Sequence, residues 1–272
     1  MIIQCTLGCA NNTCTFCSMY RDKNFRMRPQ EDIISDLREC AEQVPFIEKL
    51  FLADGDALVM PTARLLEIIY VARELFPYLR QITCYATAQD ILRKSDEELC
   101  HLRKAGLDML YVGLESGSNA ILQSVHKNLT KEQFVEAGIK AKRAGLKLSV
   151  TLILGLGQKK MSEEHVRESA EAISLVKPEY VAFLSLQLDP AAPLYEEVRS
   201  GKFVILDDVE CLSEMRAFLE QVDSEGTVFR SNHASNAVAV GGVLNREREA
   251  MIRVIDRAIE SGRFRPRGLR GL

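Results

Sequence analysis

The sequence predicts an α/β protein in which a parallel sheet forms a partial (βα)6, TIM-like barrel, followed by a C-terminal extension of helices and strands. Six short and almost continuously apolar segments alternate with segments of helical periodicity over residues 1–200. Such strands are typical of a parallel sheet covered by helices. The length of 272 residues also fits one α/β barrel, which takes roughly 250 residues. We expect residues 201–272 to pack on the open side of the barrel.

The expected strands and helices follow from local signals. Helices should begin where Pro, Ser or Thr precedes an acidic first turn and an apolar periodic run, as at Pro29, Thr62, Ser95, Thr130 and Ser162. Beyond Pro190 the periodicity weakens, and only helices near 207–222 and 245–260 and a strand near 226–230 are expected. The six expected barrel strands are 2–5, 49–53, 81–87, 109–114, 148–154 and 180–186.

Composition excludes several classes of protein. The chain has 35 basic and 38 acidic residues and a net charge of −3, so no overall charge attracts it to nucleic acid or to a membrane. It begins with a strand-like segment and has no leader-like or membrane-spanning stretch, so we expect a soluble cytoplasmic protein. Eight cysteines in such a chain indicate reduced thiols and a metal site rather than disulfides.

The loop that follows the first strand contains Cys9, Cys14 and Cys17. A structural zinc site needs four ligands, yet no second C-x2-C occurs and the four histidines are scattered singly. Three clustered thiolates suit a [4Fe-4S] cluster with one iron open to an exogenous ligand. Three residues separate Cys5 from Cys9, which gives the spacing C-x3-C. However, Cys5 belongs to an apolar strand, and whether it takes part stays open at this point.

Unusual polar and glycine residues follow each of the six predicted strands. In a βα barrel the loops after the strands line one face, which is where active sites lie. Each segment also has a plain structural interpretation, because Asp-Gly forms turns, a glutamate can cap a helix, and glycines serve in turns. The segments after strands two to six are 54–56, 89–90, 115–118, 155–157 and 187–189.

Three segments resemble the radical SAM superfamily, in particular the branch of methylthiotransferases and oxygen-independent coproporphyrinogen oxidases, over the core domain only. They are the cysteine loop, the GLESGS segment 113–118 and the PAAPLY segment 190–195. The loop departs from the common C-x3-C-x2-C spacing, since it reads C-x4-C-x2-C, with Phe16 as the expected aromatic. The resemblance covers about residues 1–200 and implies the partial barrel fold.

The resemblance implies a mechanism and two cofactors, a [4Fe-4S] cluster and S-adenosyl-L-methionine (SAM). The amino and carboxylate groups of SAM would chelate the fourth iron. An electron from flavodoxin or ferredoxin would then cleave SAM to methionine and a 5′-deoxyadenosyl radical, which abstracts hydrogen from the substrate. The resemblance further implies that the loop after strand two binds the SAM amino group, with Asp56 ahead of Asp54. The residues expected to bind SAM are Asp54, Gly55, Asp56, Glu115, Ser116, Gly155 and Gln187.

The segment 230–236 gathers hydrogen-bonding side chains outside the barrel. A lone histidine is often structural, but the crowding of polar groups also fits a loop that closes over the barrel mouth. We therefore expect Arg230, Asn232 and His233, together with Gln89, to contact the substrate.

The predicted function is that of a radical SAM lyase or oxidoreductase with a small-molecule substrate, for example a modified nucleobase as in the queuine lyases. No auxiliary cluster, cobalamin site or RNA-binding module is expected from the sequence. One alternative is a tRNA-modifying enzyme that uses the arginine-rich segment 263–270 to contact RNA. Another is a non-catalytic iron–sulfur redox sensor or carrier without an open iron site.

Overall fold

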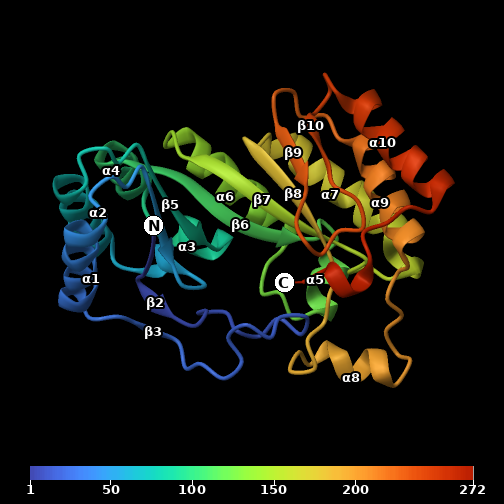
Figure 1. Ribbon diagram of the computed structural model, residues 1–272, viewed down its shortest axis with the longest axis horizontal. Coiled ribbons are helices and arrows are strands. Elements are labelled where there is room, and N and C mark those ends of the chain that lie inside the picture. Colours follow the sequence, from blue (N-terminus) through green and yellow to red (C-terminus); the bar gives the residue numbers. More distant parts are fainter. Residues whose placement is uncertain (272) are drawn as a thin grey trace. The chain divides into compact units, whose positions relative to one another are not determined.

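The computed structural model describes residues 1–271, and its main feature is an eight-stranded sheet with the strand order β1-β4-β5-β6-β7-β8-β9-β10 (Figure 1). The pairs β1–β4, β4–β5, β5–β6, β7–β8 and β8–β9 are parallel, and β9–β10 is antiparallel. The predicted α/β class with a parallel sheet is therefore confirmed. The strands of this sheet are β1 (Ile2–Gln4), β4 (Lys49–Ala53), β5 (Gln81–Ala86), β6 (Leu107–Glu115), β7 (Lys147–Leu154), β8 (Tyr180–Ser185), β9 (Val228–Ser231) and β10 (Val240–Val243).

The helices alternate with the strands as the sequence predicts. The capping box predicted at Ser95 is present, since its side chain accepts from the Glu98 N–H and the Glu98 side chain accepts from the Ser95 N–H. Thr62 is not a cap, because Pro61 holds that position and α2 begins at Thr62. The helices are α1 (Gln30–Gln43), α2 (Thr62–Leu75), α3 (Ala88–Arg93), α4 (Asp96–Ala105), α5 (Asn119–Ser124), α6 (Lys131–Arg143), α7 (Ser162–Val176), α8 (Leu194–Arg199), α9 (Asp208–Gln221) and α10 (Arg248–Ser261), with short 3-10 turns at Ala57–Val59, Lys159–Met161 and Arg267–Leu269.

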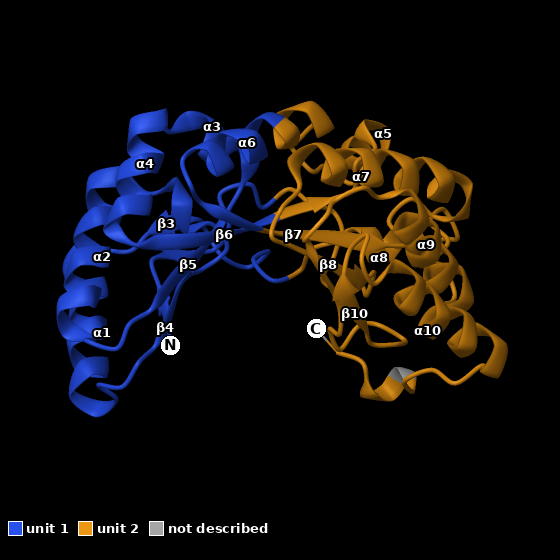
Figure 2. Ribbon diagram, turned by 90° about the horizontal axis from the view of Figure 1, so that it is seen from above, with its two compact units in different colours: residues 1–12, 19–112, 136–148 blue, residues 13–18, 113–135, 149–272 orange. Residues whose placement is uncertain are grey.

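The chain divides into two compact units, and the first comprises residues 1–12, 19–112 and 136–148 (Figure 2). Helix α2 contacts both α1 and α4, and α1 contacts β1. Leu50, Leu52, Ile82 and Cys84 are each 1% exposed or less. Because side chains alternate along a strand, these four share one face of β4 and β5. That face forms the core of the first unit.

The second unit comprises residues 13–18, 113–135 and 149 onward. Helix α9 contacts α7 and α10, and α10 contacts β10. The rings of Phe183 on β8 and Phe218 on α9 lie edge-to-face with centroids 4.8 Å apart, and Phe229 on β9 lies 5.8 Å from Phe183. These buried aromatic rings join the expected C-terminal extension to β8. A domain boundary at residue 200 stays a prediction.

Candidate active site

The cysteine loop is closed at its base by a short ribbon in the first unit. Strands β2 (Thr6–Leu7) and β3 (Arg26–Met27) pair antiparallel, so the chain leaves and returns at neighbouring points. Gly8 follows the ribbon with φ +78°, a left-handed conformation that suits glycine. The loop thus follows the first strand, as predicted.

The eight cysteines are all present as thiols. Cys9, Cys14 and Cys17 are partly exposed, as ligands to an added cofactor must be. Cys5 is fully buried, and burial raises the pKa of its thiol to about 12. Because a metal is bound by the thiolate, the buried Cys5 is a poor ligand. This burial favours the other three cysteines, and their assignment as the ligands stays a prediction.

Each part of the loop is anchored within its own unit. Cys9 belongs to the first unit, whereas Cys14 and Cys17 belong to the second. The Cys17 N–H donates to the Cys14 carbonyl at 3.2 Å, and the Thr15 N–H donates to the Val125 carbonyl at the end of α5 at 2.9 Å. Within residues 1–271, no three His, Cys, Asp or Glu side chains are grouped as ready metal ligands. The assignment of the cysteines as ligands therefore stays a prediction from spacing and family.

Asp54, at the end of β4, holds the cysteine loop in place. Its Oδ2 accepts from the Gly8 N–H at 3.3 Å and lies 3.7 Å from Lys23 Nζ. Burial and a hydrogen bond to Asp54 raise the pKa of Tyr20. Asp56 is 1% exposed. Binding of SAM by these two carboxylates stays a prediction, and the contacts of Asp54 give it a positioning role as well.

Gly55 brings its backbone very close to the loop. A Cβ added there would lie 2.7 Å from Tyr20 Cε2 and 2.9 Å from Cys9 Cβ. Such distances are shorter than van der Waals contact, so a side chain at this position would displace Tyr20 or Cys9. The first unit therefore requires glycine at the point where β4 ends beside Cys9.

Glu115, at the end of β6, has a left-handed backbone with φ +66° and is 8% exposed. A non-glycine residue in this conformation costs of order 1–3 kcal/mol, and such residues cluster at functional sites. Its Oε1 accepts from Lys127 Nζ at 2.9 Å. A Cβ at Gly113 would lie 2.0 Å from the same Oε1. The GLESGS segment thus needs its first glycine to make room for the glutamate.

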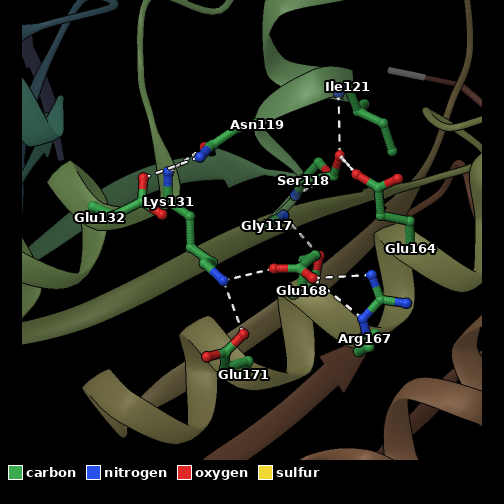
Figure 3. A network of polar contacts seen from close by, with 12 residues as sticks. Gly117, Ser118, Asn119, Ile121, Lys131, Glu132, Glu164, Arg167, Glu168 and Glu171 are labelled. Carbon is green, nitrogen blue, oxygen red and sulfur yellow. Dashed lines mark hydrogen bonds and ion pairs between the residues drawn. The ribbon is translucent and has the colours of Figure 1, made fainter.

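The rest of the GLESGS segment is fixed by α7 within the second unit (Figure 3). The Ser118 hydroxyl donates to Glu164 Oε1 at 2.5 Å and accepts from the Ile121 N–H, so Ser118 and not Glu115 caps α5. The Gly117 N–H donates to Ser169 Oγ at 2.8 Å. Lys131 joins α6 to α7 through Glu168 and Glu171 at 2.6 and 2.8 Å. These contacts make the segment a rigid turn.

Two of the predicted SAM-binding residues are linked by a buried network. Ser116 Oγ lies 2.8 Å from His165 Nδ1, and the Gly155 N–H donates to Glu214 Oε2 at 2.7 Å. Burial lowers the pKa of His165 to about 4 and raises that of Glu214 to about 7. Ser116 is fully buried, so it supports the end of β6 from within the network, and its contact with SAM stays a prediction. Sequence analysis did not predict this network, and its one available signal was Glu214, a glutamate among the buried apolar positions of α9.

The predicted substrate-binding residues occupy three places. Arg230 is exposed on β9, Asn232 is exposed just after it, and Gln89 is half-buried in the first turn of α3. His233 is half-buried, and its Nδ1 lies 2.9 Å from Ser235 Oγ. Gln187, expected to bind SAM, is half-buried just after β8. None of these assignments is tested by the structure, and all stay predictions.

The segment 232–236 is anchored to the end of β8. The Asn236 Nδ2 donates to the Phe183 carbonyl at 2.7 Å, and the Ser185 N–H donates to Ser235 Oγ at 3.2 Å. Arg265 Nη1 donates to the His233 carbonyl at 3.0 Å. In addition, the Arg270 guanidinium forms a fork with the Asp208 carboxylate at 2.6 and 3.0 Å. Two arginines of the basic segment 263–270 are thus engaged within the second unit.

Comparison with protein families identifies the class. The radical SAM superfamily model matches residues 3–173, more than half of the chain, so the chain belongs to the radical SAM superfamily. It is 25% identical over 179 residues to tRNA-2-methylthio-N(6)-dimethylallyladenosine synthase of Clostridioides difficile (strain 630), covering 62% of this chain and 36% of that one. The chain therefore spans about a third of the length of this curated relative.

Solved structures agree on the fold. Methylornithine synthase is similar with a TM-score of 0.57 at 16% identity, over 84% of this chain and 63% of that one. Coproporphyrinogen III oxidase from Escherichia coli is similar with a TM-score of 0.59 at 15% identity, over 81% of this chain and 52% of that one. The methyltransferase TsrM from Kitasatospora setae is similar with a TM-score of 0.59 at 18% identity, over 74% of this chain and 38% of that one. At these identities the likeness shows the partial barrel fold alone.

The chain is a radical SAM enzyme, and its family implies a [4Fe-4S] cluster, SAM and a source of electrons. The residues present fit these cofactors, because three accessible thiols lie in one short loop and the glycine Gly55 approaches Cys9 closely. Across residues 1–271, no helix has both the length and the apolar character needed to cross a membrane.

Proposed function

We propose that this radical SAM enzyme abstracts hydrogen from a small-molecule substrate, with a modified nucleobase as a specific example, in a lyase or oxidoreductase reaction. The observation that carries this proposal is the arrangement in the first unit, where Asp54 and Gly55 lie against Cys9 and Tyr20 at the end of β4. Fixed loops of this kind enclose and position a cofactor, which is the main contribution of a protein to cofactor chemistry.

Each residue has a role in the proposal. Cys9, Cys14 and Cys17 would hold the cluster, and the loop around Gly55 and Asp56 would orient SAM. When bound, the cluster and SAM supply a 5′-deoxyadenosyl radical after one electron arrives from flavodoxin or ferredoxin. The substrate would be held by the residues predicted from the sequence, namely Gln89, Arg230, Asn232 and His233.

The test is anaerobic reconstitution with iron and sulfide, reduction with dithionite, addition of SAM and an assay for 5′-deoxyadenosine. The protein should form this product, and a variant with Cys9, Cys14 and Cys17 replaced by alanine should not. A matched variant with Cys40 and Cys100 replaced by alanine should retain it, since these thiols lie on α1 and α4. A loaded cluster that forms no product, with an EPR spectrum unchanged by SAM, would instead support the redox sensor or carrier.

A tRNA substrate is the second candidate, and similarity to the tRNA-2-methylthio-N(6)-dimethylallyladenosine synthase of Clostridioides difficile favours it. Against it stand the net charge of −3 and the engagement of Arg265 and Arg270 within the second unit. Binding to tRNA depends on phosphate contacts and falls steeply with salt. A tRNA affinity that weakens in proportion to salt would support this candidate, and its absence would support the small-molecule substrate.

A further inference from the structure

The face of the first unit's sheet that lies opposite its helices carries three aromatic side chains. Side chains alternate along β4, β5 and β6, and residues paired in parallel register point to the same side. Phe51 pairs with Thr83, and Tyr85 pairs with Tyr111. Phe51, Tyr85 and Tyr111 therefore share one face, while Leu52 and its buried neighbours occupy the other. Figure 2 shows α1, α2 and α4 along one side of β4 and β5.

The three rings form an edge-to-face triangle, which we call the aromatic platform (Phe51, Tyr85 and Tyr111). The ring centroids of Phe51 and Tyr85 lie 4.7 Å apart at 76°, and those of Phe51 and Tyr111 lie 5.3 Å apart at 62°. Tyr85 and Tyr111 complete the triangle at 6.2 Å and 73°. Since each ring contacts the other two in a favourable geometry, the platform is ordered before any ligand arrives.

The platform is accessible although it lies in the middle of the unit's strands. Tyr85 is 43% exposed, and Ile2, which pairs with Phe51 on the neighbouring strand β1, is 71% exposed. Large apolar side chains gathered on a central sheet face are normally covered, and an exposed group of them marks a binding surface. The part of the face formed by positions 51, 83, 85, 109 and 111 consists of Phe, Thr, Tyr, Met and Tyr. These five positions offer no cation for a phosphate.

The platform continues into the predicted cofactor site. Asp54 directly follows β4, three residues after Phe51. Burial raises the pKa of Tyr85, and the charge of Asp54 raises it further. Asp54 also holds Gly8 and Tyr20, and the Tyr20 ring lies beside Gly55, which approaches Cys9. All of these residues belong to the first unit. A ligand on the platform would therefore lie next to the Cys9 end of the loop.

We propose that the aromatic platform binds the substrate by stacking and that the substrate is a small, uncharged, planar heteroaromatic ring. This inference rests on the proposed function and gives its substrate a chemical class. The ring faces of Phe51, Tyr85 and Tyr111 supply stacking, and the hydroxyl of the exposed Tyr85 supplies a polar contact at the edge. The five positions are uncharged, which disfavours a polyanion such as RNA. The ligand is therefore the free ring and not a ring within RNA.

The test uses the reconstituted holoprotein and the fluorescent base 2-aminopurine as the probe. The chain has no tryptophan, so its side chains do not absorb where the probe is excited. The iron–sulfur cluster does absorb there, so quenching is compared between preparations with the same iron content. Stacking should quench the probe in a saturable manner. Tyr85→Ala should weaken the apparent affinity by about tenfold, which lies within the range that alanine substitution of one stacked aromatic ring produces. Tyr70→Ala removes a tyrosine that is 59% exposed on α2 and should leave the affinity unchanged.

Tyr85→Leu keeps apolar bulk without an aromatic face, so it separates stacking from folding. It should lose most of the quenching while its thermal transition stays that of the unmodified protein. The inference is overturned by a Tyr85→Leu variant that binds the probe as well as the unmodified protein does, or by the absence of saturable quenching. It is equally overturned if quenching occurs only with 2-aminopurine inside an RNA hairpin, or if a dimer that Tyr85→Ala dissociates covers the face.

A parallel assay separates this inference from the proposed function. The same unmodified preparation is assayed for 5′-deoxyadenosine after reduction with SAM present. If 5′-deoxyadenosine forms but the probe does not bind, the aromatic platform is not the substrate site and the proposed function still stands. If the probe binds but no 5′-deoxyadenosine forms, the proposed function is wrong, and the bound ring is then not identified as a substrate.

Discussion

Nε2 of His165 lies 3.9 Å from Oε2 of Glu214, and both side chains are 1% exposed. Ser116 contacts the other ring nitrogen, and Gly155 and Ser162 donate to the carboxyl group. The network thus connects the ends of β6 and β7 to α9. Two titratable groups at the centre of such a network make the stability of the second unit depend on pH.

The two groups should change stability with pH in opposite directions. The pKa of His165 is lowered to about 4 in the folded chain, so its contribution is lost as pH falls from about 6.5 toward 4. The pKa of Glu214 is raised to about 7, so its contribution is present below about 4.5 and is lost as pH rises to 7. Between these limits the two effects offset each other in the unmodified protein.

Glu214→Gln should therefore expose the effect of the histidine alone. Its free energy of unfolding should fall as the pH is lowered from 6.5 to 4.5, by on the order of 2 kcal/mol. At pH 8 the carboxyl group of the unmodified protein is charged although it is buried, which is unfavourable. Glu214→Gln should therefore lower the free energy of unfolding at pH 8 by less than His165→Gln does. Urea denaturation across this pH range is the measurement. Parallel pH curves for Glu214→Gln and the unmodified protein would contradict the assignment.

Lys127 balances the charge of Glu115, and replacing Lys127 should lower the free energy of unfolding. Lys127 Nζ and Glu115 Oε1 lie 2.9 Å apart, with the two side chains 17% and 11% exposed. Lys127→Met leaves a carboxylate without its cation in a mostly buried position, which should cost about 3 kcal/mol. The double variant with Glu115→Gln should recover much of this loss. Guanidinium unfolding of the four proteins gives the coupling energy, and purely additive losses would count against the pair.

Gly55→Ala should disturb the cysteine loop before it disturbs the fold. The added methyl group would meet Tyr20 and Cys9 at less than 3.0 Å, and relief of such overlap typically costs about 1–3 kcal/mol. We expect less iron per chain after reconstitution and a small decrease in the midpoint of thermal unfolding. Gly268→Ala is the matched control, since a Cβ there meets nothing within 4 Å. Normal iron loading in Gly55→Ala would show that the loop tolerates the displacement.

The six barrel strands and the parallel class of their sheet could be predicted because each strand is short, apolar and followed by a helix signal. The seventh and eighth strands were harder to predict. Strand β9 was expected only as part of an extension, and β10 reads Val-Gly-Gly-Val, in which two central glycines weaken the strand signal. Strand β9 lies parallel to β8 and continues the sheet.

The candidate site was predictable only where its residues are close in sequence. The cysteine spacing and the Asp54–Asp56 turn are local patterns. Lys127 is separated from Glu115 by a helix, and the approach of Tyr20 to Gly55 depends on the fold. The exposure of Ile2 and Tyr85 also contradicts the simple expectation that apolar strands are covered on both faces.

Arg270 should stabilise the chain and not bind RNA. Its guanidinium forms two hydrogen bonds with Asp208 at the start of α9, and its side chain is 7% exposed. Loss of such a charge-assisted fork should cost about 1–3 kcal/mol. Arg270→Gln should therefore lower the midpoint of thermal unfolding, whereas Arg263→Gln, at an exposed position of the same segment, should not.

The same two variants test the role of the basic segment in binding. If residues 263–270 contacted tRNA, each arginine that neutralises a phosphate would add about 0.7–0.9 to the slope of log affinity against log salt. We expect no such slope for the unmodified protein and no difference between it and Arg263→Gln. A salt-dependent affinity that decreases in Arg263→Gln, the variant with normal stability, would assign the segment to RNA contact and make tRNA the better candidate substrate.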